Sequence, residues 1–295
     1  MTLLPTCLCF SVLWLADGQP RTSRYPRPEL LVEATDLKRP KQDFCILDAR
    51  PRGAFQAGHV PGAVWVDHAG WSRDFNKDQD PETWSRRVGE LGIDVDVPVV
   101  VYDDGSTKDV ARIWWILRFW GVRDVRLLNG GWRAWQAAGG EIAQQTSPPA
   151  SRSPKLSPRA NRLATKEQIL AWLRDNDRQI IDARTQGEFC GEAKTAKRNG
   201  AMPGAIHLEW VELLDKDQRF KKPEELAKLF QDAGIRLHCP AVTHCQSGGR
   251  SSVMAFALEL MGADDVRNYY KSWAEWGNAD DTPIVKPKVG TGRSK

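Results

Sequence analysis

The chain has 295 residues, 41% of them hydrophobic, and this length accommodates two globular domains with well-buried cores. Its 42 basic and 38 acidic residues give a formal net charge of +4. A balance this even argues against nucleic acid or an anionic membrane as the main partner, and small molecules are the expected ligands.

Residues 1–24 are expected to be a signal peptide and leader. They begin with MTLLPTCLCFSVLWLADGQP, an apolar run of signal-peptide length that ends in small and polar residues. The run is too short and too early to span a bilayer as part of the fold, so we expect no stable membrane insertion. Export to the periplasm or the exterior is therefore predicted. Because no lysine or arginine precedes the run, a misassigned start codon or a buried N-terminal strand in a cytoplasmic protein stays open.

The rest of the chain contains an internal repeat. Three blocks of the first copy return in the second: FCILDARPRGAF as QIIDARTQGEF, HVPGAVWV as AMPGAIHL, and GVRDVRLLNGGWRAW as GADDVRNYYKSWAEW. The repeat predicts two homologous domains, over residues 25–143 and 163–284.

Each copy alternates short apolar runs, such as VPVVVYD and PAVTHC, with helical patterns, such as ARIWWILRFWG and KPEELAKLFQDAG. This alternation predicts an α/β fold in which each domain is an open, mainly parallel sheet with helices on both faces. The active site of such a sheet lies at the carboxyl ends of its strands. The many tryptophans are expected in the core and between the domains.

Two further segments lie outside the domains. Residues 144–162 are rich in Pro and Ser and almost free of apolar residues, so they are predicted to be a linker that continues neither core. Residues 285–295 are expected to be a basic tail.

Among six cysteines, Cys245 has the most informative surroundings. The cysteines form no close-spaced disulfide framework and no Cys-x-x-Cys pair, so no metal site is predicted. Cys245 follows the apolar run AVTH and precedes a turn containing Gly248 and Gly249, after which a helical pattern begins. These glycines let successive N–H groups curl around one point, and the helix N-terminus adds partial positive charge.

The same turn supplies a charge, because Arg250 adds a fixed cation, with four residues between it and Cys245. Cys245 is therefore predicted to be a thiolate near neutral pH. A cradle of this kind favours nucleophilic chemistry on an anionic substrate through a covalent intermediate.

The sequence from about Tyr25 to Ile284 resembles the tandem-domain rhodanese family, the thiosulfate and mercaptopyruvate sulfurtransferases. The resemblance rests on the paired Asp-Ala-Arg and Pro-Gly-Ala blocks, the Trp-x-x-Trp endings and the loop CQSGGRS. It implies that Cys245 is the catalytic nucleophile. It also implies a substrate-binding loop made of Gln246, Ser247, Gly248, Gly249, Arg250 and Ser251.

The resemblance further implies that the first domain is catalytically silent, because Asp103 stands opposite Cys245 and a carboxylate forms no persulfide. Asp182 and Arg184 are expected either to brace the active loop or to form a structural ion pair. Glu188 is a further supporting residue, which stands where the animal enzymes have a substrate-binding arginine.

The implied reaction moves the outer sulfur of thiosulfate onto Cys245 and then to cyanide or a thiol, without a metal or organic cofactor. Gln246 and Ser247 differ from the animal rhodaneses, and the loop lacks the Gly-Ser-Gly-Val-Thr of mercaptopyruvate enzymes, so it looks closer to bacterial thiosulfate enzymes.

The alternatives are a 3-mercaptopyruvate sulfurtransferase and a non-catalytic binding or persulfide-carrier module. A phosphatase or arsenate reductase is disfavoured by the short loop. We expect a monomer.

Overall fold

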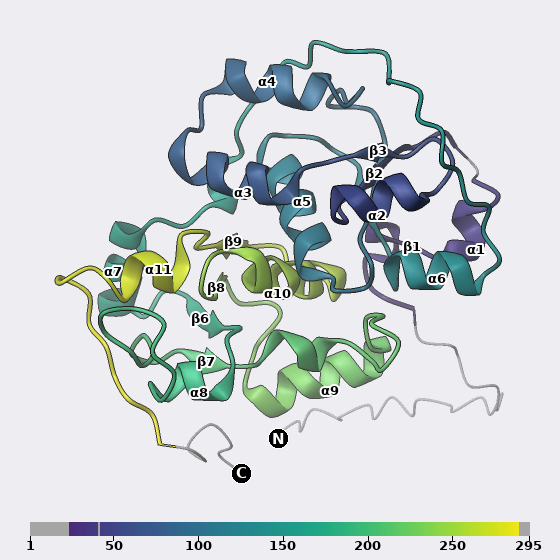
Figure 1. The fold of residues 1–295 in the computed structure, drawn as a ribbon. Coiled ribbons are helices and arrows are strands. Elements are labelled where there is room, and N and C mark those ends of the chain that lie inside the picture. Colours follow the sequence, from purple (N-terminus) through teal and green to yellow (C-terminus); the bar gives the residue numbers. More distant parts are fainter. Residues whose placement is uncertain (1–23, 41, 289–295) are drawn as a thin grey trace, which may run out of the picture.

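The computed structural model describes residues 24–40 and 42–288, which form two α/β domains joined by a long connecting segment (Figure 1). The predicted signal peptide and the end of the basic tail lie outside the described residues, so both stay predictions. No helix within the described ranges is long and apolar enough to cross a membrane.

The first domain is built on a five-stranded sheet in the order β1-β5-β4-β2-β3, with every neighbouring pair parallel. The strands are β1 (Leu31–Val32), β2 (Cys45–Asp48), β3 (Val64–Trp65), β4 (Val99–Tyr102) and β5 (Val125–Leu128). The helices are η1 (Pro28–Leu30), α1 (Ala34–Leu37), α2 (Arg52–Ala57), α3 (His68–Lys77), α4 (Pro81–Gly89), α5 (Lys108–Phe119) and α6 (Gly131–Ala137). Every residue of the central strand β4 is buried, as a strand covered by helices on both faces requires.

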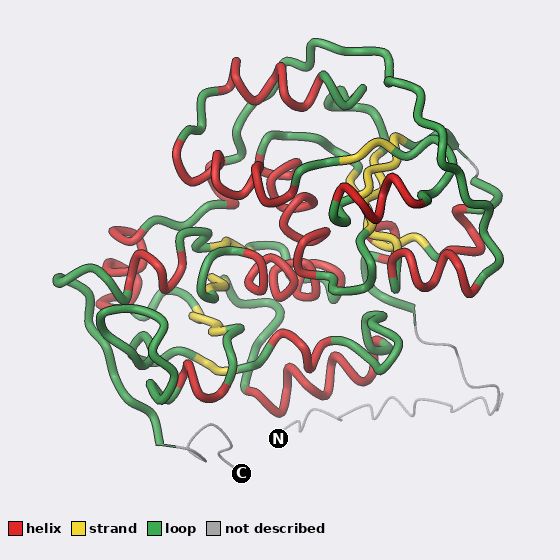
Figure 2. Tube along the Cα trace, viewed as in Figure 1, coloured by secondary structure: helices red, strands yellow, loops and turns green. Residues whose placement is uncertain are grey.

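The second domain repeats this plan with four strands in the order β7-β6-β8-β9, again all parallel. The strands are β6 (Gln179–Asp182), β7 (Ile206–His207), β8 (Ala241–His244) and β9 (Val266–Asn268). The helices are η2 (Ala160–Arg162), α7 (Lys166–Asp175), α8 (Gln186–Phe189), η3 (Trp210–Leu213), α9 (Pro223–Ala233), α10 (Gly249–Leu260) and α11 (Ser272–Trp276). The two groups of strands, each surrounded by helices, are visible in Figure 2 and confirm the predicted fold class.

The register of the second sheet positions the candidate site. Asp182 at the end of β6 lies opposite His244 at the end of β8. The two strands therefore end side by side, and the chain leaves β8 directly into Cys245 and α10. Cys245 thus stands at the carboxyl edge of the sheet, where the sequence predicts it.

The two domains share a core across the contact between α5 and α10. The Trp114 and Phe256 rings meet edge to face with centroids 4.9 Å apart, and Trp115 stacks on Tyr270 at 5.1 Å. All four side chains are buried and belong to one continuous cluster that draws on both sheets. Burial of aromatic surface on this scale holds the first domain firmly against the second.

The connecting segment is fastened to the first domain. Arg152 donates its backbone N–H to Gly89 (3.0 Å), and Arg159 donates to Phe119 (2.7 Å). These bonds hold Leu156 inside the shared core. The prediction that this segment continues neither core is therefore wrong for Leu156, because an average over a polar composition does not reveal one apolar side chain pinned by backbone hydrogen bonds.

Candidate active site

The Cys245 loop (residues 245–250) connects β8 to α10 and wraps its backbone around the cysteine sulfur. Gly248 precedes the helix with φ +91°, and a Cβ there would lie 2.8 Å from the Tyr270 ring, so only glycine fits. Its N–H donates to Cys245 Sγ at 3.2 Å. The cysteine is only 1% exposed. The sulfur is therefore held at a helix N-terminus inside a cradle of backbone, as the glycine pattern predicts.

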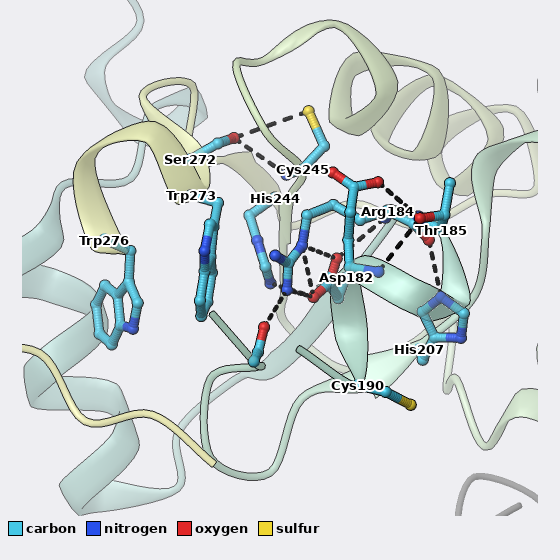
Figure 3. Close-up of polar contacts among 12 residues, drawn as sticks. Asp182, Arg184, Thr185, Cys190, His207, His244, Cys245, Ser272, Trp273 and Trp276 are labelled. Atoms are coloured by element: carbon cyan, nitrogen blue, oxygen red, sulfur yellow. Dashed lines mark hydrogen bonds and ion pairs between the residues drawn. The ribbon is translucent and has the colours of Figure 1, made fainter. Parts of the chain in front are cut away.

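A second element, the start of α11, closes around the same cysteine. The hydroxyl of Ser272 accepts the Cys245 N–H at 3.0 Å, donates to Tyr269 O and lies 3.9 Å from Cys245 Sγ (Figure 3). The N–H of Trp273 donates to Cys245 O at 3.0 Å. Ser272 has φ +55°, a left-handed conformation that is costly for serine.

Ser272 is a site residue that the sequence analysis missed, although the repeat contained a signal for it. In the repeat, Ser272 and Trp273 correspond to Gly131 and Trp132, and Gly131 adopts nearly the same φ, +56°. A glycine in the first copy marks a backbone position that needs positive φ. In the second copy a serine accepts that strain, and its hydroxyl reaches Cys245.

The surroundings of Cys245 favour its ionised form. Burial alone would raise the pKa of the thiol, but the Arg250 guanidinium and hydrogen bonds from Ser251 and the Ser247 backbone outweigh it. The net result is a pKa below the ordinary value of a cysteine. A sulfur so placed is a nucleophile in its thiolate form.

Arg250 and Glu188 form a bidentate ion pair beside the loop. Arg250 donates to the two Glu188 carboxylate oxygens at 2.6 and 2.8 Å. Thr185 caps the N-terminus of α8, and its N–H and hydroxyl also donate to Glu188. Burial raises the pKa of Glu188, but these hydrogen bonds outweigh it and hold the pKa at about 2. Arg250 is thus a fixed cation near the sulfur. The Glu188 carboxylate balances the charge of its guanidinium.

Asp182 and Arg184 form a fully buried pair behind the loop (Figure 3). Arg184 makes contacts of 2.6–3.1 Å with the carboxylate, donates to Gly200 O at 2.7 Å and lies 4.1 Å above the Trp273 ring centroid. His244 Nε2 lies 3.5 Å from Asp182, and burial lowers the pKa of His244 to about 4, which keeps it neutral.

The first domain contains the same arrangement. Arg50 pairs with Asp48 at 2.6 Å, donates to Gly58 O and lies 4.1 Å from the Trp132 ring centroid. A pair that occurs unchanged in a domain without the cysteine is a structural brace of the strand ends. This favours the structural interpretation of Asp182 and Arg184.

In the first domain, Asp103 occupies the position that Cys245 has in the second. Its carboxylate accepts the Gly105 N–H at 2.8 Å and the Ser106 hydroxyl at 3.1 Å. Burial is the main cause that raises the pKa of Asp103 to about 6. The cradle of this domain is therefore filled by its own carboxylate.

The remaining residues of the predicted substrate-binding loop differ in their solvent exposure. Gln246 is half-buried and donates to Thr195 O at 3.1 Å, whereas Ser247 is exposed. Ser251 is buried and contacts Gly248 O and Asn268. Ser251 thus supports the loop from within, while Gln246 and Ser247 form its outer side.

One more contact comes from the first domain. Arg112 of α5 donates to the Ser247 carbonyl at 3.0 Å. The sequence places the tryptophans of this helical pattern in the core and between the domains, but a single sequence does not show that Arg112 faces the Cys245 loop. Among the described residues no group of His, Cys, Asp and Glu could hold a metal ion.

The family model for the Rhodanese-like domain matches residues 33–138 and, a second time, residues 165–279. The chain belongs to this family. The resemblance noted in the sequence is thereby confirmed, and one matched range falls in each domain of this rhodanese-like protein.

Similar proteins carry two different names. The chain is 31% identical to a putative thiosulfate sulfurtransferase of Mycolicibacterium smegmatis, over 85% of this chain and 94% of the relative. It is 30% identical to the thiosulfate sulfurtransferase of Azotobacter vinelandii, over 86% and 96%. It is 29% identical to the 3-mercaptopyruvate sulfurtransferase of Escherichia coli K12, over 94% and 100%. These relatives are sulfurtransferases by name and differ in the donor.

Among solved structures, an anaerobic ergothioneine biosynthesis enzyme from Chlorobium limicola superposes with a TM-score of 0.84. The match covers 92% of this chain and 73% of that enzyme at 24% identity. At this identity the likeness concerns the fold.

Proposed function

We propose that this protein is a sulfurtransferase that moves the sulfane sulfur of thiosulfate to cyanide or a thiol through a persulfide on Cys245. The observation that carries the proposal is the Cys245 sulfur held 3.2 Å from the Gly248 N–H at the start of α10. The relatives named thiosulfate and 3-mercaptopyruvate sulfurtransferases support the reaction class.

In the first step the Cys245 thiolate attacks the outer sulfur of thiosulfate. A new S–S bond forms to Cys245, the S–S bond of thiosulfate breaks, and sulfite leaves with its electron pair. The product is a cysteine persulfide whose terminal sulfur carries the negative charge. The loop amides and the dipole of α10 stabilise this anion as they stabilise the thiolate.

In the second step the acceptor attacks the terminal sulfur. With cyanide, a carbon–sulfur bond forms, the persulfide bond breaks, and thiocyanate leaves while Cys245 returns as the thiolate. With cyanide as the acceptor, neither step transfers a proton or uses a cofactor, whereas a thiol acceptor attacks as its thiolate after losing its proton to solvent. The site requires only a stabilised sulfur anion, which the Cys245 loop provides.

This proton balance favours thiosulfate as the donor. The Cys245 sulfur accepts the Gly248 N–H and lies 3.9 Å from the Ser272 hydroxyl, and neither group is a strong acid. Mercaptopyruvate would release a pyruvate enolate that must be protonated. It remains the second candidate because the relative from Escherichia coli K12 aligns over its whole length.

The test follows the intact mass of the purified protein after incubation with thiosulfate and again after cyanide. We expect the wild type to gain one sulfur atom and to lose it as thiocyanate. Cys245→Ser should gain none. Cys190→Ser is the matched control, since Cys190 is also buried, in the same domain, and should load like the wild type.

Other outcomes would redirect the proposal. Loading by 3-mercaptopyruvate but not by thiosulfate would exchange the donor. Loading by either donor with negligible turnover to cyanide or small thiols would indicate a persulfide carrier. No loading by either donor would contradict the sulfurtransferase proposal.

A further inference from the structure

One peptide unit of the Cys245 loop connects the cysteine sulfur to the first domain. The Gly248 N–H donates to Cys245 Sγ at 3.2 Å, and the Ser247 carbonyl of the same peptide accepts from Arg112 at 3.0 Å. In a planar trans peptide the C=O and N–H groups point in opposite directions. A group that fixes the carbonyl therefore also fixes the direction of the N–H that faces the sulfur.

Arg112 is held for this contact by both domains. It lies on α5 of the first domain and also donates to Ser72 Oγ on α3 and to the Tyr270 hydroxyl of the second domain, the latter at 3.3 Å. Its guanidinium carbon lies 5.7 Å from the Tyr270 ring centroid. Three neutral oxygens on three elements thus set its position.

Gly249 provides the space that Arg112 needs. A Cβ on Gly249 would lie 2.5 Å from Arg112 Nη2, well inside contact distance. This glycine has an ordinary negative φ, so its backbone does not require glycine. The missing side chain is explained by the close approach of the guanidinium to the loop.

The two arginines at the loop differ in their charge balance. Arg250 is neutralised by Glu188 through two hydrogen bonds. Arg112 bonds to neutral oxygens, and within the described part of the chain it forms no ion pair. Its positive charge therefore acts on the Ser247–Gly248 peptide with no carboxylate bonded to it, and Asp109 of the same helix acts on it without a hydrogen bond. A cation on the carbonyl polarises the peptide and strengthens the hydrogen bond that its N–H donates.

We propose that Arg112 is a positioning residue for Cys245, which acts across the domain interface through the Ser247–Gly248 peptide. It orients and polarises the N–H that stabilises the anionic sulfur. The silent domain thereby takes part in the reactivity of the second domain. The catalytic consequence rests on the proposed function, whereas the effect on the thiolate is a property of Cys245 itself.

The charged and titratable groups near the sulfur come from several elements. They are Asp109 and Arg112 on α5, Asp182 and Arg184 at the end of β6, Glu188 on α8, His244 on β8, Arg250 on α10 and Tyr270 before α11. A variant at Arg112 changes one of these groups and leaves the pair formed by Arg250 and Glu188 in place.

The test measures the rate of alkylation of Cys245 by iodoacetamide as a function of pH, followed on the peptide that contains Cys245. Arg112→Met should raise the pH midpoint by about one unit, which corresponds to roughly tenfold slower alkylation below the midpoint. Arg112→Lys, which keeps a donor and a charge, should recover part of this loss. Under the proposed function, kcat/KM for thiosulfate should fall in the same order.

The matched control is Arg118→Met, on the same helix. Arg118 donates to the carbonyls that follow α5 and does not touch the loop, so its variant should keep the wild-type midpoint. An unchanged midpoint in Arg112→Met, or an equal shift in Arg118→Met, would overturn the inference. Alkylation needs no sulfur donor, so its outcome is independent of whether thiosulfate is the substrate.

A second variant reaches the same contact from the other side. Gly249→Ala would push the guanidinium away from the Ser247 carbonyl and should raise the midpoint in the same direction. If Arg112→Met fails to fold, as judged by its thermal melting curve, the outcome of Gly249→Ala decides. A folded Gly249→Ala protein with the wild-type midpoint would overturn the inference.

Discussion

Replacing Glu188 with glutamine keeps the shape of the side chain and removes the charge that holds Arg250 beside the loop. The folded protein holds the pKa of Glu188 at about 2, against an ordinary value of 4.5. A group with a lowered pKa stabilises the folded state above its unfolded pKa, and this stabilisation is lost as the pH falls through the folded value. The shift corresponds to about 3 kcal/mol at pH 7, about 1.4 kcal/mol at pH 3 and about 0.4 kcal/mol at pH 2.

The assay is the free energy of unfolding in urea, measured for the wild type and Glu188→Gln at pH 7 and pH 3. We expect the variant to be less stable by about 3 kcal/mol at pH 7, with the gap shrinking to roughly half at pH 3. Glu192→Gln, at an exposed carboxylate nearby, should match the wild type at both pH values. An equal gap at pH 7 and pH 3, or no gap at pH 7, would refute the assignment of the stabilisation to the ionised pair.

Three further changes test other parts of the site. Asp182→Asn leaves the buried Arg184 without its counter-charge and should cost about 3–5 kcal/mol in urea unfolding; a loss below 1 kcal/mol would contradict the brace. Gly248→Ala puts a methyl group where φ is +91°, so we expect at least tenfold slower persulfide loading by mass, and wild-type loading would count against the tight cradle. Ser272→Ala leaves the Cys245 N–H without its acceptor and should lower stability by about 1–3 kcal/mol in thermal melting, an effect that a compensating shift of the loop would abolish.

The sequence was most informative where a local pattern repeats. The returning Asp-Ala-Arg blocks and alternating apolar runs predict two parallel sheets, and the structure has them. The position of Cys245 could also be predicted, because a strand, a glycine turn and a helix follow one another within a few residues. Such features depend on neighbours along the chain, which a single sequence shows directly.

Contacts between residues that are distant along the chain could not be predicted from the sequence. Arg250 reaches Glu188 and Arg112 reaches Ser247 only after helices from different parts of the chain have packed. Nothing within the pattern around Arg112 distinguishes it from the other polar residues of a helix that is otherwise buried. The unusual backbone of Ser272 was easier to predict, since its counterpart in the first copy is a glycine, and that glycine has positive φ.

The shared core between α5 and α10 makes the two copies dependent on each other for folding. A half containing only residues 163–284 would expose the ring of Phe256 and the aromatic face around Tyr270 to water. Each such ring favours burial by about 1.5–3 kcal/mol. A protease cut within the connecting segment should therefore leave two fragments that stay associated through gel filtration and melt in one transition. The first domain, which has Asp103 at the position of Cys245, is therefore half of a single folding unit.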